Sequence, residues 1–261
     1  MRPSSYVNWI ASLNVDEAFV LLVAPVAIIA GLGALAFRAL LGSFIGTAST
    51  VGTTKAGVAA EIYAVVLGFM IFFGFEHFNE TRQAVLLEAS MLERLAAEAE
   101  FIPGDQVQFA KAVDTYVDTV LTEEWPRLEV GNTVDLISGG TLQLDHDLRA
   151  VFAGANDYDT TRIFSLVDEI NELRAIRLSA NPDDVVASAI FQMLVVGLLL
   201  SVVTGWFVRG PSIVIHMSLS TIVSGSLVML MVLAAQLSYP FTGAVSIPKS
   251  SFANLVENRD Q

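Results

Sequence analysis

The sequence predicts an all-α integral membrane protein, with four transmembrane helices and a helical extramembrane domain inserted between the second and the third. The chain of 261 residues is 54% hydrophobic and has a mean hydropathy of +0.60, which is too apolar for a typical soluble protein. Its apolar residues gather in four runs, each close to the ~20 residues that a spanning helix needs. The runs are Ala18–Phe37, Gly57–Phe75, Val185–Val208 and Ile213–Leu237.

The middle of the chain differs from the rest in charge. Residues 79–184 hold 21 acidic and 8 basic residues, a net charge of −13 that equals the charge of the whole chain. Such an acidic segment argues against nucleic acid and anionic lipid headgroups as partners, because phosphate groups would be repelled. Its plainest role is solubility in water.

The predicted domain organisation has four parts. Residues 1–78 form an N-terminal segment with the first two transmembrane helices, and residues 79–184 form the acidic helical domain. Residues 185–238 form the third and fourth transmembrane helices, and residues 239–261 form a C-terminal tail that is partly extended. We expect no cleaved signal peptide, because Asp16 and Glu17 directly precede the first apolar run.

The second apolar run is expected to continue as a much longer helix. No proline interrupts the chain from Gly57 to about Glu100, and good helix formers dominate its second half. At 1.5 Å per residue, this helix would be roughly 66 Å long, of which about half could lie in a bilayer. The other elements can be placed relative to this rod.

The acidic domain is predicted to consist of three further helices. Asp105–Arg127 carries an apolar stripe, Thr141–Gly154 supports a second helix, and Asp157–Ala180 supports a third that ends before Pro182. The first stripe consists of Val107, Ala110, Val113, Val117, Val120 and Leu121. The stripe of the third helix consists of Ile163, Leu166, Val167, Ile170, Leu173 and Ile176.

Four spans place both termini and the acidic domain on one side of the membrane. The two short loops on the other side hold Arg38, Lys55 and Arg209 and no acidic residue. By the positive-inside rule, these loops are expected to be cytoplasmic.

No motif for catalysis, metal binding or cofactor binding occurs in the sequence. The chain has no cysteine, and His77, His146 and His216 lie far apart without metal-ligand spacing. Glycine-rich phosphate loops and nucleophile elbows are missing as well. We therefore expect no enzyme, no metal and no cofactor.

The second apolar run carries a face on which a pore could be built. Glu61, Val65, Gly68, Phe72 and Glu76 recur at steps of three and four residues, and Phe69 flanks them. If several copies surrounded an axis, Val65, Gly68, Phe69 and Phe72 would form an apolar gate, and Glu61 and Glu76 would set the ion selectivity.

The same residues also have simpler interpretations. Aromatic residues at helical spacing usually pack against neighbouring helices, and Glu76 could merely lie at the membrane surface. A carboxylate at mid-membrane costs about +2.5–3.5 kcal/mol, which favours a function for Glu61. Glu61 could instead reach the interface or pair with Lys55.

The order of the helices resembles the bestrophin-like family, a bacterial domain family whose helix order matches that of the bestrophin channels. The resemblance covers roughly residues 15–256 and lies in four stretches: YAVVLGF at 63–69 with the phenylalanine-rich run after it, EWP at 124–126, LRAIRL at 173–178, and YPFTG at 239–243. It implies a multi-pass protein of the bacterial inner membrane.

Similarity to the bestrophins themselves rests on VLGF at 66–69 and EHFNE at 76–80. Bestrophins are pentameric anion channels whose second helix lines an apolar neck, which implies that Val65, Phe69 and Phe72 are neck residues. Two features of this chain differ. Glu61 would disfavour anions, and bestrophins keep the inserted domain in the cytoplasm, opposite to the expectation from the loop charges. The sign of the permeant ion therefore stays open.

These observations support three functions. The first is passive conduction of inorganic ions by a homo-oligomer, expected to be a pentamer, in contact with membrane lipid. The second is a non-conducting, membrane-anchored scaffold or sensor whose helical domain binds a partner protein. The third is a secondary transporter, which should show repeats with broken helices at mid-membrane.

Overall fold

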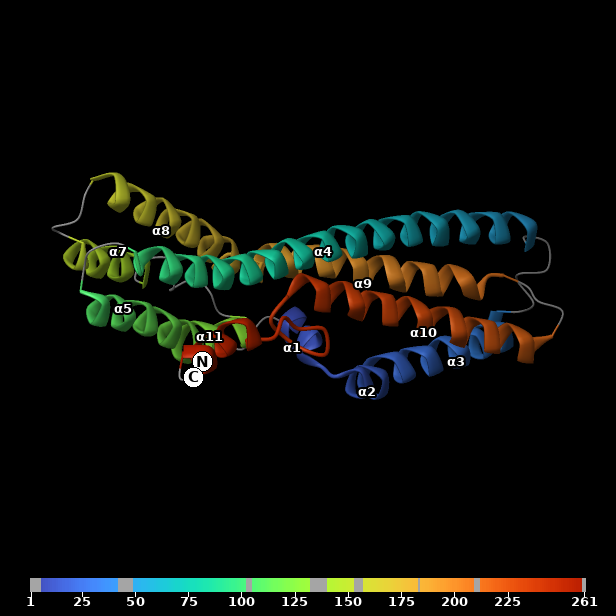
Figure 1. Ribbon diagram of the computed structural model, residues 1–261. Helices are drawn as coiled ribbons and strands as arrows, with labels where there is room; N and C mark the ends of the chain where they lie inside the picture. The colour runs from blue at the N-terminus through green and yellow to red at the C-terminus, as the bar shows by residue number, and fades with distance from the viewer. Residues whose placement is uncertain are drawn as a thin grey trace. The chain divides into compact units, whose positions relative to one another are not determined.

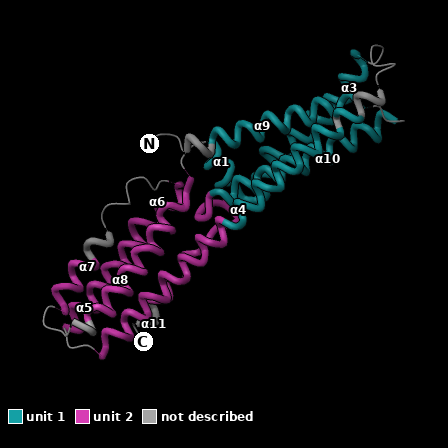
Figure 2. Tube along the Cα trace, turned by 90° about the horizontal axis from the view of Figure 1, so that it is seen from above, with its two compact units in different colours: residues 1–76, 183–238 teal, residues 77–182, 239–261 magenta. Residues whose placement is uncertain are grey.

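The computed structural model describes residues 6–41, 49–101, 105–131, 140–152, 157–182, 184–208 and 212–259, and all regular structure within them is helical (Figure 1). The chain divides into two compact units (Figure 2). The first contains Met1–Glu76 and Asp183–Ser238, and the second contains His77–Pro182 and Tyr239–Gln261. Arg209 and the short hairpin that contains it lie outside the described residues.

The first unit holds the apolar helices. They are α1 (Tyr6–Ser12), α2 (Val15–Ala18), η1 (Phe19–Val23), α3 (Ala24–Leu41), the first part of α4 (Ser49–Ala99), α9 (Asp184–Trp206) and α10 (Ile213–Ser238). Four stretches are long and apolar enough to cross a membrane: Val15–Leu41, Gly57–Ala99, Ser188–Trp206 and Ile213–Ser238. The prediction of four such helices is confirmed.

Small residues let α3 and α10 approach closely. On α3 the buried residues are Ala27, Ala30, Gly31 and Ala34, and α10 buries Ser224 and Gly225 among its apolar residues. A Cβ added to Gly225 would lie 3.4 Å from the Cβ of Ala27. Such stripes of small residues are typical of helix pairs in membranes, where backbone contact replaces the hydrophobic effect as the source of stability.

Both π-helical turns directly precede an X-Pro step. Η1 ends before Ala24-Pro25, and η2 (Val120–Glu124) ends before Trp125-Pro126. A proline ring in a regular α-helix clashes with the carbonyl four residues earlier, and in both cases that carbonyl belongs to the π turn. Widening the turn relieves this clash while the helix continues through it.

The prediction of one uninterrupted rod is confirmed. Helix α4 runs from Ser49 to Ala99, so it begins eight residues before the predicted Gly57 and ends one residue before Glu100. Residues 49–76 of this helix belong to the first unit, and residues 77–99 belong to the second.

The second unit is a helical bundle with its own core. Besides the end of α4, it contains α5 (Gln106–Thr119), η2, α6 (Trp125–Glu129), α7 (Gly140–Val151), α8 (Asp157–Leu178) and α11 (Ser250–Arg259). Asp105 begins α5 as an N-cap, because its carboxylate accepts hydrogen bonds from the amides of Val107 and Gln108, both at 3.1 Å. The C-terminal segment, predicted to be partly extended, includes α11.

The apolar stripe predicted for Asp105–Arg127 is partly wrong. Val107 is 78% exposed and Ala110 is exposed, whereas Val113, Val117 and Val120 are buried as predicted. The buried face is centred on Phe109 and Tyr116, whose larger side chains the predicted stripe left out. These two aromatic residues, seven positions apart, determine which side of α5 is buried, because burying a ring removes more apolar surface from water than burying a valine.

Candidate functional site

The face of α4 that was predicted to line a pore is largely exposed in the part of the subunit that the structure describes. Val65 is 58% exposed, Phe69 58% and Phe72 61%, and a Cβ added to Gly68 would meet no atom within 4 Å. The opposite face packs inside the first unit through Tyr63 and Leu67. The residues of the predicted gate therefore lie together on one side of the helix, away from its intramolecular contacts.

Among the four candidate spans, α4 is the one least covered by its own subunit. In its most apolar 18-residue window 11% of residues are buried, compared with 33%, 22% and 33% in the other three spans. A helix with apolar residues on all sides is expected to be buried in a larger core or to face lipid. The exposed face of α4 thus has room for neighbours outside the subunit.

Aromatic rings on this face contact one another along the helix. The ring of Phe73 stacks on that of Phe69, with centroids 6.3 Å apart, and meets the ring of Phe72 edge-on at 5.6 Å. Aromatic pairs of this geometry contribute about 0.5–1.5 kcal/mol beyond their buried area. The contacts restrict the rotamers of Phe69 and Phe72 within a single subunit.

Acidic residues stand at the two ends of the aromatic face. Glu61 and Glu76 are exposed, and neither forms an ion pair with any side chain that the structure describes. In particular, no ion pair joins Glu61 to Lys55. An unpaired carboxylate is unfavourable against lipid, so this face is better suited to water than to acyl chains.

An apolar pocket of about 430 Å³ lies beside this face, between α4 and α9. Ile62, Tyr63 and Val66 line it from α4, and Met193 and Gly197 are among the residues that line it from α9. The lack of a side chain at Gly197 makes room for the ring of Tyr63, because a Cβ there would lie 2.6 Å from Cδ2 of that ring. The pocket contains no gate residue.

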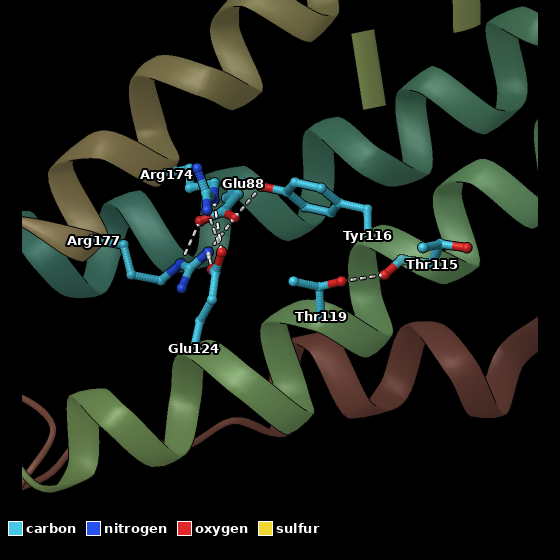
Figure 3. Close-up of polar contacts among 7 residues, drawn as sticks. All are labelled: Glu88, Thr115, Tyr116, Thr119, Glu124, Arg174 and Arg177. Carbon is cyan, nitrogen blue, oxygen red and sulfur yellow. Dashed lines mark hydrogen bonds and ion pairs between the residues drawn. The ribbon is translucent and has the colours of Figure 1, made fainter. Parts of the chain in front are cut away.

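The second unit contains a buried ionic network that the sequence did not predict (Figure 3). Arg177 donates to Glu88 from Nε at 2.7 Å and from Nη2 at 2.8 Å, and its Nη2 also lies 2.8 Å from Oε2 of Glu124. Arg174 donates from Nε to Oε1 of Glu124 at 2.9 Å, and its Nη2 binds the same oxygen. The hydroxyl of Tyr116 donates to Oε1 of Glu88 at 2.7 Å.

Helical periodicity explains how these residues meet. The buried stripe of α8 runs through Ile163, Val167 and Ile170, and further steps of four and three residues reach Arg174 and Arg177. The two arginines are buried, while Leu173 and Ile176, which were predicted for the stripe, are only half-buried. Two arginines that continue the helical spacing of a buried apolar stripe were the signal in the sequence that could have revealed the network.

The charges of the two glutamates and two arginines in the network sum to zero, and this neutrality allows their burial. Isolated burial of any one charge would be costly, whereas hydrogen-bonded opposite charges offset much of the desolvation. One nitrogen, Nη1 of Arg177, has no hydrogen-bond partner among the described residues. The guanidinium carbon of Arg177 lies 5.5 Å from the ring centroid of Phe252.

The network shifts the pKa values of its members. Burial raises the pKa of Tyr116 well above its ordinary value, and the adjacent Glu88 raises it further. Burial alone would raise the pKa of Glu124, but attraction to Arg177 and hydrogen bonding to Arg174 outweigh it and hold that pKa below its ordinary value. Burial would lower the pKa of Arg177, but its neighbours Glu88 and Glu124 raise that pKa, so Glu124 and Arg177 remain charged around neutral pH.

Aromatic residues pack beside the network in the same unit. The ring of Trp125 meets that of Phe241 edge-on at 5.3 Å and that of Phe252 at 6.0 Å. Three of the stretches that carried the family resemblance, EWP at 124–126, LRAIRL at 173–178 and YPFTG at 239–243, thus contribute to one core. They act here through packing and ion pairing within the second unit.

The histidines do not come together. Nε2 of His77 lies 2.7 Å from the carbonyl oxygen of Ala180, whereas His146 lies on α7 and His216 on α10. Within the described residues, no three His, Asp or Glu side chains are arranged to hold a metal ion.

The comparisons with known proteins identify a family. A family model of the bestrophin-like domain matches residues 23–252. No curated protein and no solved structure gave a match to the chain.

Proposed function

Because the chain belongs to the bestrophin-like family, we propose that it forms a homo-oligomeric channel through which inorganic ions cross a membrane passively. The second candidate span, on α4, lines the path in each subunit. By similarity to bestrophins, the oligomer is a pentamer. The family and the four apolar helices support a channel-like membrane protein.

One observation supports this proposal most directly: the aromatic face of α4 is exposed although it is opposite to the face that packs in the subunit. Val65, Phe69 and Phe72 would meet their copies around a symmetry axis and form an apolar constriction. Apolar constrictions gate channels by expelling water, and charged rings next to them set which ions enter. Glu61 and Glu76, which precede and follow these residues on α4, would form such charged rings.

The remaining parts of the proposal follow from composition. The second unit stands outside the bilayer and forms a helical vestibule, and the protein resides in the bacterial inner membrane. Its partners are membrane lipid, inorganic ions and further copies of itself. No enzymatic activity, cofactor or nucleic acid partner belongs to this function.

The test is ionic current across a planar bilayer that contains the purified protein, under asymmetric KCl. The reversal potential gives the sign of the preferred ion. In Glu61→Gln and Glu76→Gln, loss of a negative ring should move the reversal potential toward the value for anions. Phe69→Ala/Phe72→Ala should widen the neck and raise the conductance.

A matched control tests whether the change in conductance comes from the neck or from the loss of any exposed aromatic side chain. Phe19 is 54% exposed on η1, outside α4, so Phe19→Ala should leave the conductance unchanged. No current from folded oligomers, including Phe69→Ala/Phe72→Ala, would contradict the channel and favour the scaffold. An equal rise in Phe19→Ala would contradict the assignment of the neck.

A further inference from the structure

The part of α4 in the second unit also has one buried and one exposed face. The buried face consists of Thr81, Ala84, Val85, Glu88, Ala89, Leu92, Leu95 and Ala99. Five of these residues, Val85, Ala89, Leu92, Leu95 and Ala99, belong to the hydrophobic core of the unit. The exposed residues opposite to it are Gln83, Leu86, Leu87, Ser90 and Arg94. This second exposed face is therefore the side of α4 that the described residues of the unit leave largely uncovered.

Helical spacing relates this face to the predicted pore face. Steps of seven, seven and four residues lead from Glu76 to Gln83, Ser90 and Arg94 along one uninterrupted helix. Seven residues correspond to nearly two whole turns, so these positions stay on the same side of the helix within about 40°. Glu76 and Arg94 therefore lie on the same side of α4.

Charges on this face differ from those of the acidic unit as a whole. Along this side of α4, the exposed Glu80 lies about 40° around the helix from both Glu76 and Arg94, whereas Arg82 and Glu93 project about 100–120° away from them. Arg94 is the one basic residue on this side of the second unit's part of α4. The other exposed acidic residues of the second unit lie beyond this stretch of α4, as Asp118 and Glu172 do on α5 and α8.

Among the residues that the structure describes, no ion pair neutralises the charge of Arg94. Its natural partner on the helix is Glu98, four residues later. Glu98 instead forms an ion pair with Arg162 of α8 at 2.5 Å. Arg94 is exposed and forms no ion pair with any residue in the described part of the chain.

We propose that Arg94 is a selectivity-determining residue of the channel. This inference rests on the proposed function, because it requires an oligomer axis along α4. Around that axis, the copies of Arg94 form a positive ring inside an otherwise acidic unit. The ring repels cations, attracts anions and opposes the effect of Glu61 and Glu76 on the permeability ratio.

The experiment compares the K⁺/Cl⁻ permeability ratios of wild type, Arg94→Gln, Arg94→Lys and Arg82→Gln in planar bilayers under asymmetric KCl. Arg94→Gln should raise the ratio several-fold, and Arg94→Lys should retain the wild-type ratio because it keeps the charge. Arg82 is exposed on the same helix but points elsewhere, so Arg82→Gln should shift the ratio much less. The difference between Arg94→Gln and wild type should shrink from 0.1 M to 1 M salt, as the Debye length falls from about 10 Å to about 3 Å.

The outcomes distinguish this inference from the channel itself. If wild type conducts but Arg94→Gln keeps its permeability ratio, or if Arg82→Gln shifts the ratio equally, the role of Arg94 is overturned and the channel stands. If no folded variant conducts, both are overturned.

Discussion

Arg177 donates two hydrogen bonds to the carboxylate of Glu88, at 2.7 and 2.8 Å, while both side chains are completely shielded from solvent. The pair links α8 to α4 across 89 residues of sequence. Burial of Glu88 depends mainly on Arg177, which is the one side chain that forms an ion pair with it among the described residues. The stability of the second unit should therefore depend on these residues far more than on its surface ion pairs.

Replacing Arg177 tests this dependence. Arg177→Met keeps much of the side-chain volume but leaves Glu88 without its main counter-charge, which should destabilise the second unit by about 3–5 kcal/mol. Thermal unfolding of the purified protein, followed by circular dichroism in detergent, measures the loss. In the control Arg149→Met, the broken pair with Asp145 lies at the surface, so little change is expected. Equal midpoints for the two variants would contradict a stabilising role for the network.

Acid should weaken the second unit through Glu124. Its pKa in the folded protein lies below the ordinary value of 4.5, so the ion pairs stabilise the fold fully above that value. Their contribution is lost as the pH falls below about 4.5 toward the folded pKa, where the carboxylate becomes protonated. The drop in unfolding temperature between pH 6 and pH 3 should be smaller in Glu124→Gln than in wild type. An identical drop in both would show that Glu124 does not carry the acid sensitivity.

The apolar helices could be predicted from the sequence, because hydropathy and length are local properties. Four runs of apolar residues and the absence of proline after Gly57 were enough to predict the spans and the long helix α4. The π turns before Pro25 and Pro126 were not predicted, since a proline in a helix can also cause a kink or an end.

The ionic network could not be predicted in the same way. Glu88 lies in a helix rich in charged residues, where a glutamate usually faces water, and its partners follow 28 and 89 residues later. The sequence indicated Arg174 and Arg177 only as part of a family stretch, because a predicted buried stripe is defined by apolar residues alone. Charged residues that continue an apolar stripe, as these two do after Ile170, are the pattern to look for.

Close packing between α4 and α9 should make Gly197 sensitive to substitution. The Cβ of Gly197→Ala would lie 2.6 and 2.8 Å from two atoms of the Tyr63 ring, which is itself buried. Overpacking of this kind costs about 1–3 kcal/mol. Gly205 on the same helix has open space around it, so Gly205→Ala should be neutral or slightly stabilising. Thermal midpoints in detergent measure both, and a neutral Gly197→Ala would contradict the contact.

The most direct measurement of the central claim uses the absence of cysteine from the chain, because each introduced cysteine is the only thiol. Phe72→Cys places it on the aromatic face of α4, and Ile222→Cys places it on α10, where the native residue is 63% exposed. A charged, water-soluble thiol reagent is added while the current across a planar bilayer is recorded. The channel account predicts that the current of Phe72→Cys falls by more than half and that the current of Ile222→Cys is unchanged. Unchanged current in Phe72→Cys, or equal block in Ile222→Cys, would contradict a water-filled path along α4.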